Sequence, residues 1–197
     1  MSTSHSLPLV LGSTSPFRRE ILKKLNLPFE TAAPDIDESA KNNENPQQLV
    51  LRLAQEKAKA VAAQFPRHLI IGSDQLAVVN DVVLGKPGDH DNAVHQLQQT
   101  SAQTVHFYTG LCLYNSMTGN LQSEVVPFDV VFRELSTQQI NHYLKAEQPY
   151  QCAGSFKSEG LGIALFERLI GDDPNTLIGL PLIKLIRMLE NEGVEVL

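Results

Sequence analysis

The residues best suited to phosphate chemistry follow a short apolar run near the start of the chain. Residues 7–11 (LPLVL) predict a buried strand, and a turn of small hydroxyl residues then leads through Pro16 into a helix. Such a helix start binds anions through its free backbone N–H groups and its dipole. Arg18 lies three and four positions before Ile21 and Leu22, on the inward side of the helix, where it can donate two hydrogen bonds to a phosphate. A capped surface helix with solvated arginines is equally compatible with this spacing.

A second cation lies within the clearest helical pattern, residues 46–64. Lys57 follows Leu53 by four positions and precedes Val61 by four, so it falls inside the apolar stripe of this helix. Burying an ammonium group is costly unless an anion meets it. The alternative is that its aliphatic stem lies along the edge of the stripe and carries the charge to water.

Carboxylates stand at two places that suit metal or water chemistry. Asp74 follows the apolar run 69–72, and we expect it at the end of a buried strand, where ligands bind in open α/β sheets. Three more crowd into a polar stretch predicted to be a loop: Asp35, Asp37 and Glu38. Mg²⁺ is usually held by one or two carboxylates plus phosphate oxygens. Turn formation and plain solvation are the alternatives for these carboxylates. Lys86, in the GKP sequence, could be another phosphate contact or simply a loop lysine.

Several classes of protein find no support in this sequence. The histidines show no HExxH spacing, and neither a P-loop nor a GxGxxG motif occurs. Cys112 and Cys152 form no CxxC pattern, which favours a reducing cytoplasm over a disulfide framework. The beginning of the chain lacks the features of a signal peptide, and no apolar run approaches the roughly 20 residues that cross a bilayer.

The net charge excludes some classes of binding partner. Sixteen basic and 22 acidic side chains leave a formal charge of −6, which argues against non-specific binding to nucleic acid or to an anionic membrane. We therefore expect a cytoplasmic protein with neither nucleic acid nor membrane as partner.

The elements that must position these residues alternate between strands and helices. Further strands are predicted at residues 29–32, 69–72, 76–79, 82–84, 105–114 and 121–132, and further helices at 92–100, 136–146 and 181–190. This order predicts one α/β domain over residues 1–197, with antiparallel pairs beside the early strand–helix units. The loops 34–45 and 172–179 are the expected borders of a cleft.

Eight motifs, in this order, resemble those of the Maf family of nucleotide pyrophosphatases. They are LGSTSPFRREIL (11–22), PDIDE (34–38), LAQEKA (53–58), GSDQ (72–75), GKP (85–87), TVHFYTGL (104–111), AGSFKSEGLG (153–162) and DPNTLIGLP (173–181). The resemblance implies an elongated mixed β-sheet with flanking helices and two lobes around a central cleft, as in Maf and ITPase folds. It also implies hydrolysis of a nucleoside triphosphate to the monophosphate and pyrophosphate with a divalent cation, Mg²⁺ or Mn²⁺.

The resemblance also assigns roles by position. Asp74 matches the family's proton acceptor, and its other polar site residues are matched by Ser13, Arg18, Glu38, Lys57 and Lys86. Ser13 and Arg18 would bind the substrate's phosphates. Glu38 and Asp74 are the expected metal ligands, so ligation competes with proton transfer for Asp74. A homodimer is a further expectation of the resemblance.

Three positions are expected to select the base: Phe17, Gln75 and Glu159. Relatives with arginine, threonine or serine, and glutamine at these places act mainly on dTTP and UTP, whereas this combination resembles the subgroup that hydrolyses 7-methyl-GTP. N7-methylation makes guanine a cation, which favours an aromatic face such as Phe17. Glu159 could accept from guanine N1–H and N2–H₂. The alternatives are an ordinary helix residue and a loop charge.

Two other functions stay open at this point. One is a pyrophosphatase for dTTP, UTP or other non-standard nucleotides. The other is a nucleotide-binding regulator of cell division that acts through a protein contact.

Overall fold

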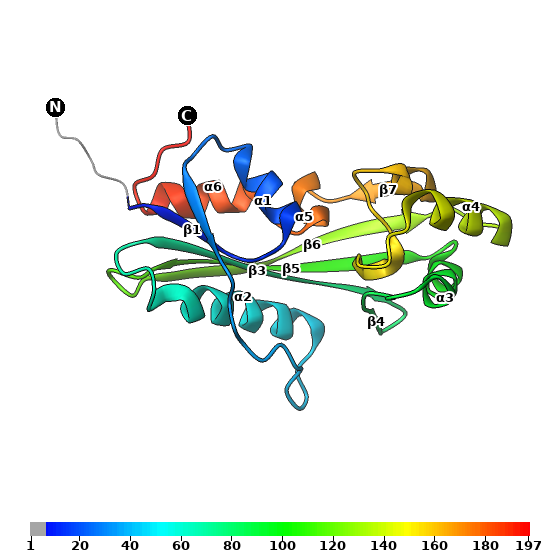
Figure 1. The fold of residues 1–197 in the computed structure, drawn as a ribbon, viewed down its shortest axis with the longest axis horizontal. Helices are drawn as coiled ribbons and strands as arrows, with labels where there is room; N and C mark the ends of the chain where they lie inside the picture. The colour runs from blue at the N-terminus through cyan, green and yellow to red at the C-terminus, as the bar shows by residue number, and fades with distance from the viewer. Residues whose placement is uncertain (1–6) are drawn as a thin grey trace. The chain divides into compact units, whose positions relative to one another are not determined.

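A mixed β-sheet flanked by helices organises the chain (Figure 1). This computed structural model describes residues 7–197, so most of the stretch for which no signal peptide is predicted lies outside the described residues. The strands are β1 (Leu9–Gly12), β2 (Phe29–Ala32), β3 (Leu69–Val79), β4 (Val82–Leu84), β5 (Thr104–Asn115), β6 (Leu121–Phe132) and β7 (Phe166–Ile170). The helices are α1 (Pro16–Lys23), α2 (Pro46–Ala62), α3 (His90–Thr100), α4 (Thr137–Glu147), α5 (Pro174–Ile178) and α6 (Leu182–Asn191). The predicted α/β class is confirmed.

Strand pairing mixes both directions. The order in the sheet is β2-β1-β3-β5-β6-β7, and β4 pairs with β3. β1 runs parallel to β2 and β3, whereas β4 is antiparallel to β3, and β7 to β6. Asn80 and Asp81, between β3 and β4, have φ of 47° and 64°, as a two-residue type I′ turn requires. The strands predicted at 76–79 and 82–84 are therefore confirmed as the two arms of a hairpin.

The chain divides into two compact units. Unit 1 comprises the described residues up to Gln75 together with Thr109–Val126 and Asp173–Leu197, and unit 2 comprises Leu76–Tyr108 and Pro127–Asp172. The chain passes from one unit to the other within β3, β5 and β6, and again between β7 and α5.

The core of unit 1 lies on both faces of its strands, because successive strand residues point to opposite faces. Leu11 and Ile71 pack in the cluster that contains the apolar residues of α1 and α6. Val10 and Ile70 pack instead in the cluster formed with Ala54, Ala58 and Val61 of α2. Figure 1 shows the same division, with α2 below the strands and α1 and α6 above them.

Two glycines let α2 approach the strands of unit 1 closely. A Cβ atom at Gly72 would lie 2.0 Å from the carbonyl oxygen of Ala54, and one at Gly110 would lie 2.0 Å from that of Val50. Both distances are far below any real contact, so only glycine permits this approach. The side chains of α2 thereby reach β3 directly.

Unit 2 is built around aromatic side chains. Phe156 makes edge-to-face contacts with Phe107, Phe132 and Phe166 at ring-centroid distances of 5.1–5.6 Å, and such pairs add stability beyond the area that they bury. Phe156 therefore attaches the glycine-rich stretch that begins at Gly154 to β5, β6 and β7.

Three elements differ from the prediction. The two strands expected at 69–72 and 76–79 form the single strand β3, in which polar Ser73, Asp74 and Gln75 continue the extended backbone. The region expected to be a loop, 172–179, contains α5, and β7 was not predicted.

No helix in residues 7–197 has the length and hydropathy needed to cross a bilayer.

Candidate active site

The start of α1 is capped by a serine. Ser15 adopts an extended backbone, its hydroxyl accepts from the backbone N–H of Arg18, and Pro16 opens the helix. Before it, the Ser13 hydroxyl accepts from the backbone N–H of Ser15 at 3.2 Å, and Ser13 is buried. The hydroxyl-rich turn is therefore ordered by its own side chains, at the end of the helix where anions are favoured.

Arg18 points inward, which confirms its predicted side of the helix. Its Nε donates to the carbonyl oxygen of Gly179 at 2.9 Å, and one terminal nitrogen donates to the Ser13 hydroxyl at 3.4 Å. Burial lowers the pKa of the guanidinium, and the nearby carboxylates of Asp74 and Glu38 oppose that change. The alternative of a solvated arginine is therefore wrong for Arg18, whereas Arg19 is exposed. Its neighbour Phe17 is 39% exposed, so its ring is open to a ligand.

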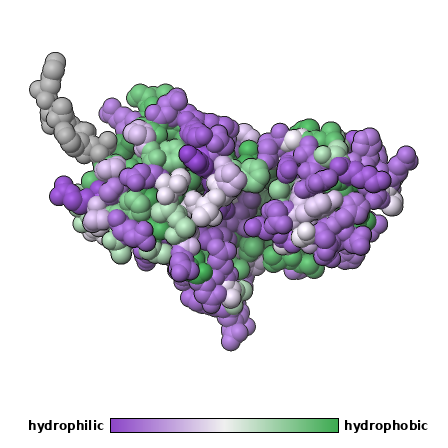
Figure 2. Space-filling model, viewed as in Figure 1, coloured by the Kyte–Doolittle hydropathy of each residue, from purple (hydrophilic) through white to green (hydrophobic). Residues whose placement is uncertain are grey.

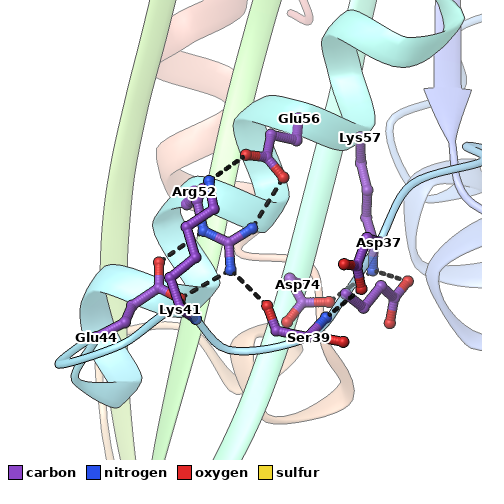
Figure 3. Close-up of polar contacts among 9 residues, drawn as sticks. Asp37, Ser39, Lys41, Glu44, Arg52, Glu56, Lys57 and Asp74 are labelled. Atoms are coloured by element: carbon purple, nitrogen blue, oxygen red, sulfur yellow. Dashed lines mark hydrogen bonds and ion pairs between the residues drawn. The ribbon is translucent and has the colours of Figure 1, made fainter.

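Lys57 is buried and paired. Its ammonium nitrogen lies 2.6 Å from Oδ1 of Asp74 and 2.8 Å from Oε1 of Glu38, and Figure 3 shows the ends of Lys57 and Asp74 close together. The ammonium group thus lies between two carboxylates, whose negative charge offsets the cost of its burial. The alternative in which the stem carries the charge to bulk water is wrong.

Strand alternation explains why Asp74 meets Lys57. Ile70 packs with α2, Gly72 contacts α2, and Asp74 is the next residue on that same face. Ser73 lies on the opposite face, where its hydroxyl donates to Gly179 at 2.9 Å. The expected strand end at Asp74 is wrong, because β3 continues to Val79. The parallel neighbour β1 pairs with β3 up to Ile71 and ends at Gly12, so Asp74 lies beyond the carboxyl end of β1 instead.

An arginine of α2 that had no predicted role anchors the acidic loop. Arg52 binds both carboxylate oxygens of Glu44 at 2.6 and 2.8 Å, and it donates to Glu56 and to the Ser39 carbonyl (Figure 3). The hydrogen bonds from Arg52 lower the pKa of Glu44 to about 2. The loop projects below α2 in Figure 1 and is hydrophilic in Figure 2. The hydrogen bond from Arg52 to the Ser39 carbonyl fixes the backbone next to Glu38.

Gln75 has an amide orientation set by the protein. Its Nε2 donates to the Thr176 carbonyl at 2.7 Å and to the Thr109 hydroxyl at 2.8 Å. A carbonyl oxygen can only accept, so the amide nitrogen must face Thr176. Both amide hydrogens are thus used, and the Oε1 atom is the one that remains for a ligand. Thr109 and Thr176 lie in motifs of the sequence but had no predicted role.

Two predicted residues lie in unit 2. Lys86 and Glu159 are both exposed, and both charges act on Cys152, whose pKa is raised mainly by burial. The backbone N–H of Gly154 donates to the carbonyl oxygen of Gly85 at 3.3 Å, so the segments that carry Glu159 and Lys86 meet within unit 2. Glu147 of α4 holds the loop that carries Glu159, because its Oε1 accepts from the backbone N–H of Leu161 at 2.9 Å. The seven other predicted residues all belong to unit 1: Ser13, Phe17, Arg18, Glu38, Lys57, Asp74 and Gln75.

Hard oxygen donors for a divalent cation are present in unit 1. Glu38 and Asp74 converge on the same ammonium group, and two carboxylates completed by phosphate oxygens are a usual donor set for Mg²⁺. Among residues 7–197, no group of three or more His, Cys, Asp or Glu side chains is arranged to hold a metal ion. The residues present therefore fit a cation that takes two ligands from the protein and the others from the phosphates of a substrate.

Comparison with known proteins identifies the family. The sequence model of Maf-like proteins matches residues 8–192. The chain belongs to the Maf family. This Maf protein is 60% identical to a 7-methyl-GTP pyrophosphatase of Colwellia psychrerythraea over 96% of its own length and 94% of the relative's. It is 58% identical to a protein of the same name from Nitrosococcus oceani over 96% and 95% of the two chains.

Solved structures give weaker likenesses to this Maf protein. The Ham1 protein of Staphylococcus aureus matches 64% of this chain and 72% of its own at 12% identity, with a TM-score of 0.44. A HAM1 protein from Coxiella burnetii matches 78% and 88% of the two chains at 12% identity, with a TM-score of 0.45.

Proposed function

We propose that this Maf protein is a nucleotide pyrophosphatase that hydrolyses 7-methyl-GTP to 7-methyl-GMP and pyrophosphate. The observation that carries the proposal is the near full-length identity, 60% and 58%, to two proteins named for that activity. The cluster of Arg18, Lys57, Asp74 and Glu38 supports it, because it combines cations for phosphate with carboxylates for a cation and a water.

In unit 1, the phosphates would be bound by Arg18, Lys57 and the hydroxyl turn at Ser13. Without substrate, the two cations face two carboxylates, Asp74 and Glu38, so their positive charge is balanced. A triphosphate can take over part of this pairing, since fixed cations stabilise the charge that develops on the departing pyrophosphate. Lys86 of unit 2 is proposed as a further phosphate contact.

The chemical step is attack of water on the α-phosphorus. The water oxygen forms a bond to phosphorus, the bond from the α-phosphorus to the bridging oxygen breaks, and pyrophosphate leaves. Asp74 would accept the proton of the water, or ligate the cation with Glu38; these two roles still compete. When bound by these carboxylates, Mg²⁺ or Mn²⁺ supplies positive charge against the triphosphate.

Selection of the base is assigned to Phe17, Gln75 and Glu159. The guanine edge offers the donors N1–H and N2–H₂. In unit 1 the Gln75 Oε1 atom is an acceptor that suits such donors, and in unit 2 the Glu159 carboxylate is another. The exposed ring of Phe17 would stack on the methylated, cationic base. Uracil or thymine presents carbonyls on either side of one N–H, which pair poorly with two acceptors.

Compartment and assembly belong to the proposal as well. Cys112 and Cys152 are free thiols, which supports a reducing cytoplasm. There the enzyme would remove 7-methyl-GTP from the nucleotide pool as a single Maf domain, and a homodimer remains an expectation of the family.

A nucleotide panel tests the substrate. Purified protein with Mg²⁺ or Mn²⁺ is given 7-methyl-GTP, GTP, dTTP, UTP and CTP, and pyrophosphate release is measured. We expect 7-methyl-GTP to be hydrolysed with the highest kcat/KM. Faster turnover of dTTP or UTP would assign the protein to the other substrate group instead.

A variant separates an enzyme from a nucleotide-binding regulator. Asp74→Asn should still bind 7-methyl-GTP but lose hydrolysis by about 100-fold or more, because the proton acceptor is gone. Asp81→Asn, in the exposed β3–β4 turn, is the matched control and should retain turnover. If Asp74→Asn abolishes hydrolysis yet keeps the protein's effect in cells, the cellular role is that of a binding module.

A further inference from the structure

The segment that carries DPNTLIGLP contributes main-chain carbonyls to the cluster in unit 1. The carbonyl oxygen of Gly179 accepts from Nε of Arg18 at 2.9 Å and from the hydroxyl of Ser73 at 2.9 Å. We infer that Gly179 and Ser73 are positioning residues, which aim the Arg18 guanidinium at the phosphates of the substrate.

The division of donors on Arg18 carries this inference. A guanidinium has five N–H donors in a rigid plane. When Nε is bound to Gly179, the rotation of the plane is set, and the two terminal nitrogens, one of which also reaches Ser13 at 3.4 Å, form the remaining fork. A fork of this kind binds two phosphate oxygens at once. The carbonyl therefore leaves free the part of Arg18 that suits a phosphate.

The carbonyl itself is held in place by the end of α5. Gly179 has φ of 113° and its N–H closes the helix onto the carbonyls of Asn175 and Thr176, a left-handed ending that favours glycine. Asp173, which is buried, accepts from the N–H of Asn175 and from that of Ile183 in α6, each at 2.8 Å. One carboxylate thus links the starts of both helices that flank Gly179.

Ser73 connects this carbonyl to the catalytic strand. It precedes Asp74 on β3 and points to the opposite face, so the Gly179 carbonyl bonds to the residue beside the proposed proton acceptor as well as to Arg18. The same carbonyl oxygen thus holds Arg18 directly and holds Asp74 through its neighbour Ser73. This inference rests on the proposed function, in which Arg18 binds the phosphates of the nucleotide.

The experiment measures binding of inorganic tripolyphosphate by calorimetry with Mg²⁺ present. In Gly179→Ala the new Cβ would lie 3.3 Å from Nε of Arg18, and alanine is strained at this φ, so the carbonyl and the guanidinium must shift. We expect affinity to fall about tenfold. Gly193→Ala is the matched control, because Gly193 also has positive φ, 76°, but open space around its Cβ; its affinity should stay within about twofold of wild type.

A double-mutant cycle distinguishes positioning from a general loss of structure. If Gly179 acts through Arg18, Gly179→Ala adds no further loss of affinity to Arg18→Ala. Ser73→Ala tests the same point with a smaller change, and we expect a loss of about threefold that also disappears in the Arg18→Ala background. If Gly179→Ala does not fold, the cycle of Ser73→Ala with Arg18→Ala decides whether the carbonyl positions Arg18.

Three results would overturn the inference: wild-type affinity in both Gly179→Ala and Ser73→Ala, an equal loss in Gly193→Ala, or losses that persist in the Arg18→Ala background. Because tripolyphosphate is not a nucleotide, this experiment tests the positioning role independently of whether 7-methyl-GTP is the substrate. A wild-type protein that ignores 7-methyl-GTP, while the cycle shows coupling, would contradict the proposed function and leave the positioning role standing.

Discussion

The ammonium nitrogen of Lys57 lies 2.6 Å from Oδ1 of Asp74, and both side chains are buried. The pair joins α2 to β3 at the one place where the apolar face of the helix carries a charge. Removing Lys57 leaves the buried Asp74 carboxylate without its hydrogen-bonded partner, whereas removing the Asp74 charge still leaves Lys57 paired with Glu38.

Lys57→Met keeps the unbranched stem and removes only the charge. We expect turnover to fall about 100-fold or more, because a phosphate-facing cation is lost, and the free energy of unfolding to fall by about 3 kcal/mol, because Asp74 loses its partner. Steady-state kinetics and urea unfolding measure the two effects. Lys59→Met, an exposed lysine on the same helix, should change neither; equal losses in both variants would refute the role of the pair.

Glu159→Gln tests how the base is selected. The amide keeps the shape of the side chain but loses its charge and one acceptor. We expect the ratio of kcat/KM for 7-methyl-GTP over that for dTTP to fall about tenfold. Glu167→Gln, exposed on β7, serves as control. A ratio that stays at the wild-type value in Glu159→Gln would exclude this carboxylate from base recognition.

Glu44 gives stability a defined pH dependence. Its pKa in the folded protein is lowered from the ordinary 4.5 to about 2 by Arg52 and by the N–H of Lys41. A carboxylate with a lowered pKa stabilises the fold above its unfolded pKa, and this contribution is lost as the pH falls from 4.5 to 2. Urea unfolding of wild type and Glu44→Gln should therefore differ most near neutral pH and converge toward pH 2. A constant difference across this range would contradict the assignment.

Gly72→Ala tests the close approach of α2 to β3. The added Cβ would lie 2.0 Å from the Ala54 carbonyl, so the helix must move away and take Lys57 with it. We expect a loss of stability of about 3 kcal/mol or more together with loss of hydrolysis. Gly85→Ala, whose Cβ would meet nothing within 4 Å, is the control for stability in thermal unfolding. A Gly72→Ala protein as stable as wild type would show that the contact is not required.

Local features of this fold were predictable from the sequence because neighbouring residues decide them. The Ser15 cap, the Ser136 cap of α4 and the Asn80-Asp81 turn each depend on a few adjacent residues. The same holds for the position of Lys57 on the apolar face of α2. The order of the motifs was enough to indicate the family, which the match over residues 8–192 confirms.

Continuity of strands was not predictable in this way. Ser73, Asp74 and Gln75 form a polar run that is typical of a turn, and the sequence therefore predicted two strands. In the fold, Ser73 and Gln75 bond to the carbonyls of Gly179 and Thr176, and Asp74 bonds to Lys57. These partners are distant in sequence, and they satisfy the polar side chains so that the strand can continue.

The sequence by itself determined the polar residues of the candidate site and the local elements that carry them. Only the tertiary structure decided their partners: Lys57 with Asp74, and Arg18 with Gly179. Each partner depends on sheet register, on a glycine that brings a helix close, or on a main-chain carbonyl. A carbonyl is common to every residue and leaves no signature in a sequence, so its role emerges only when the chain is folded.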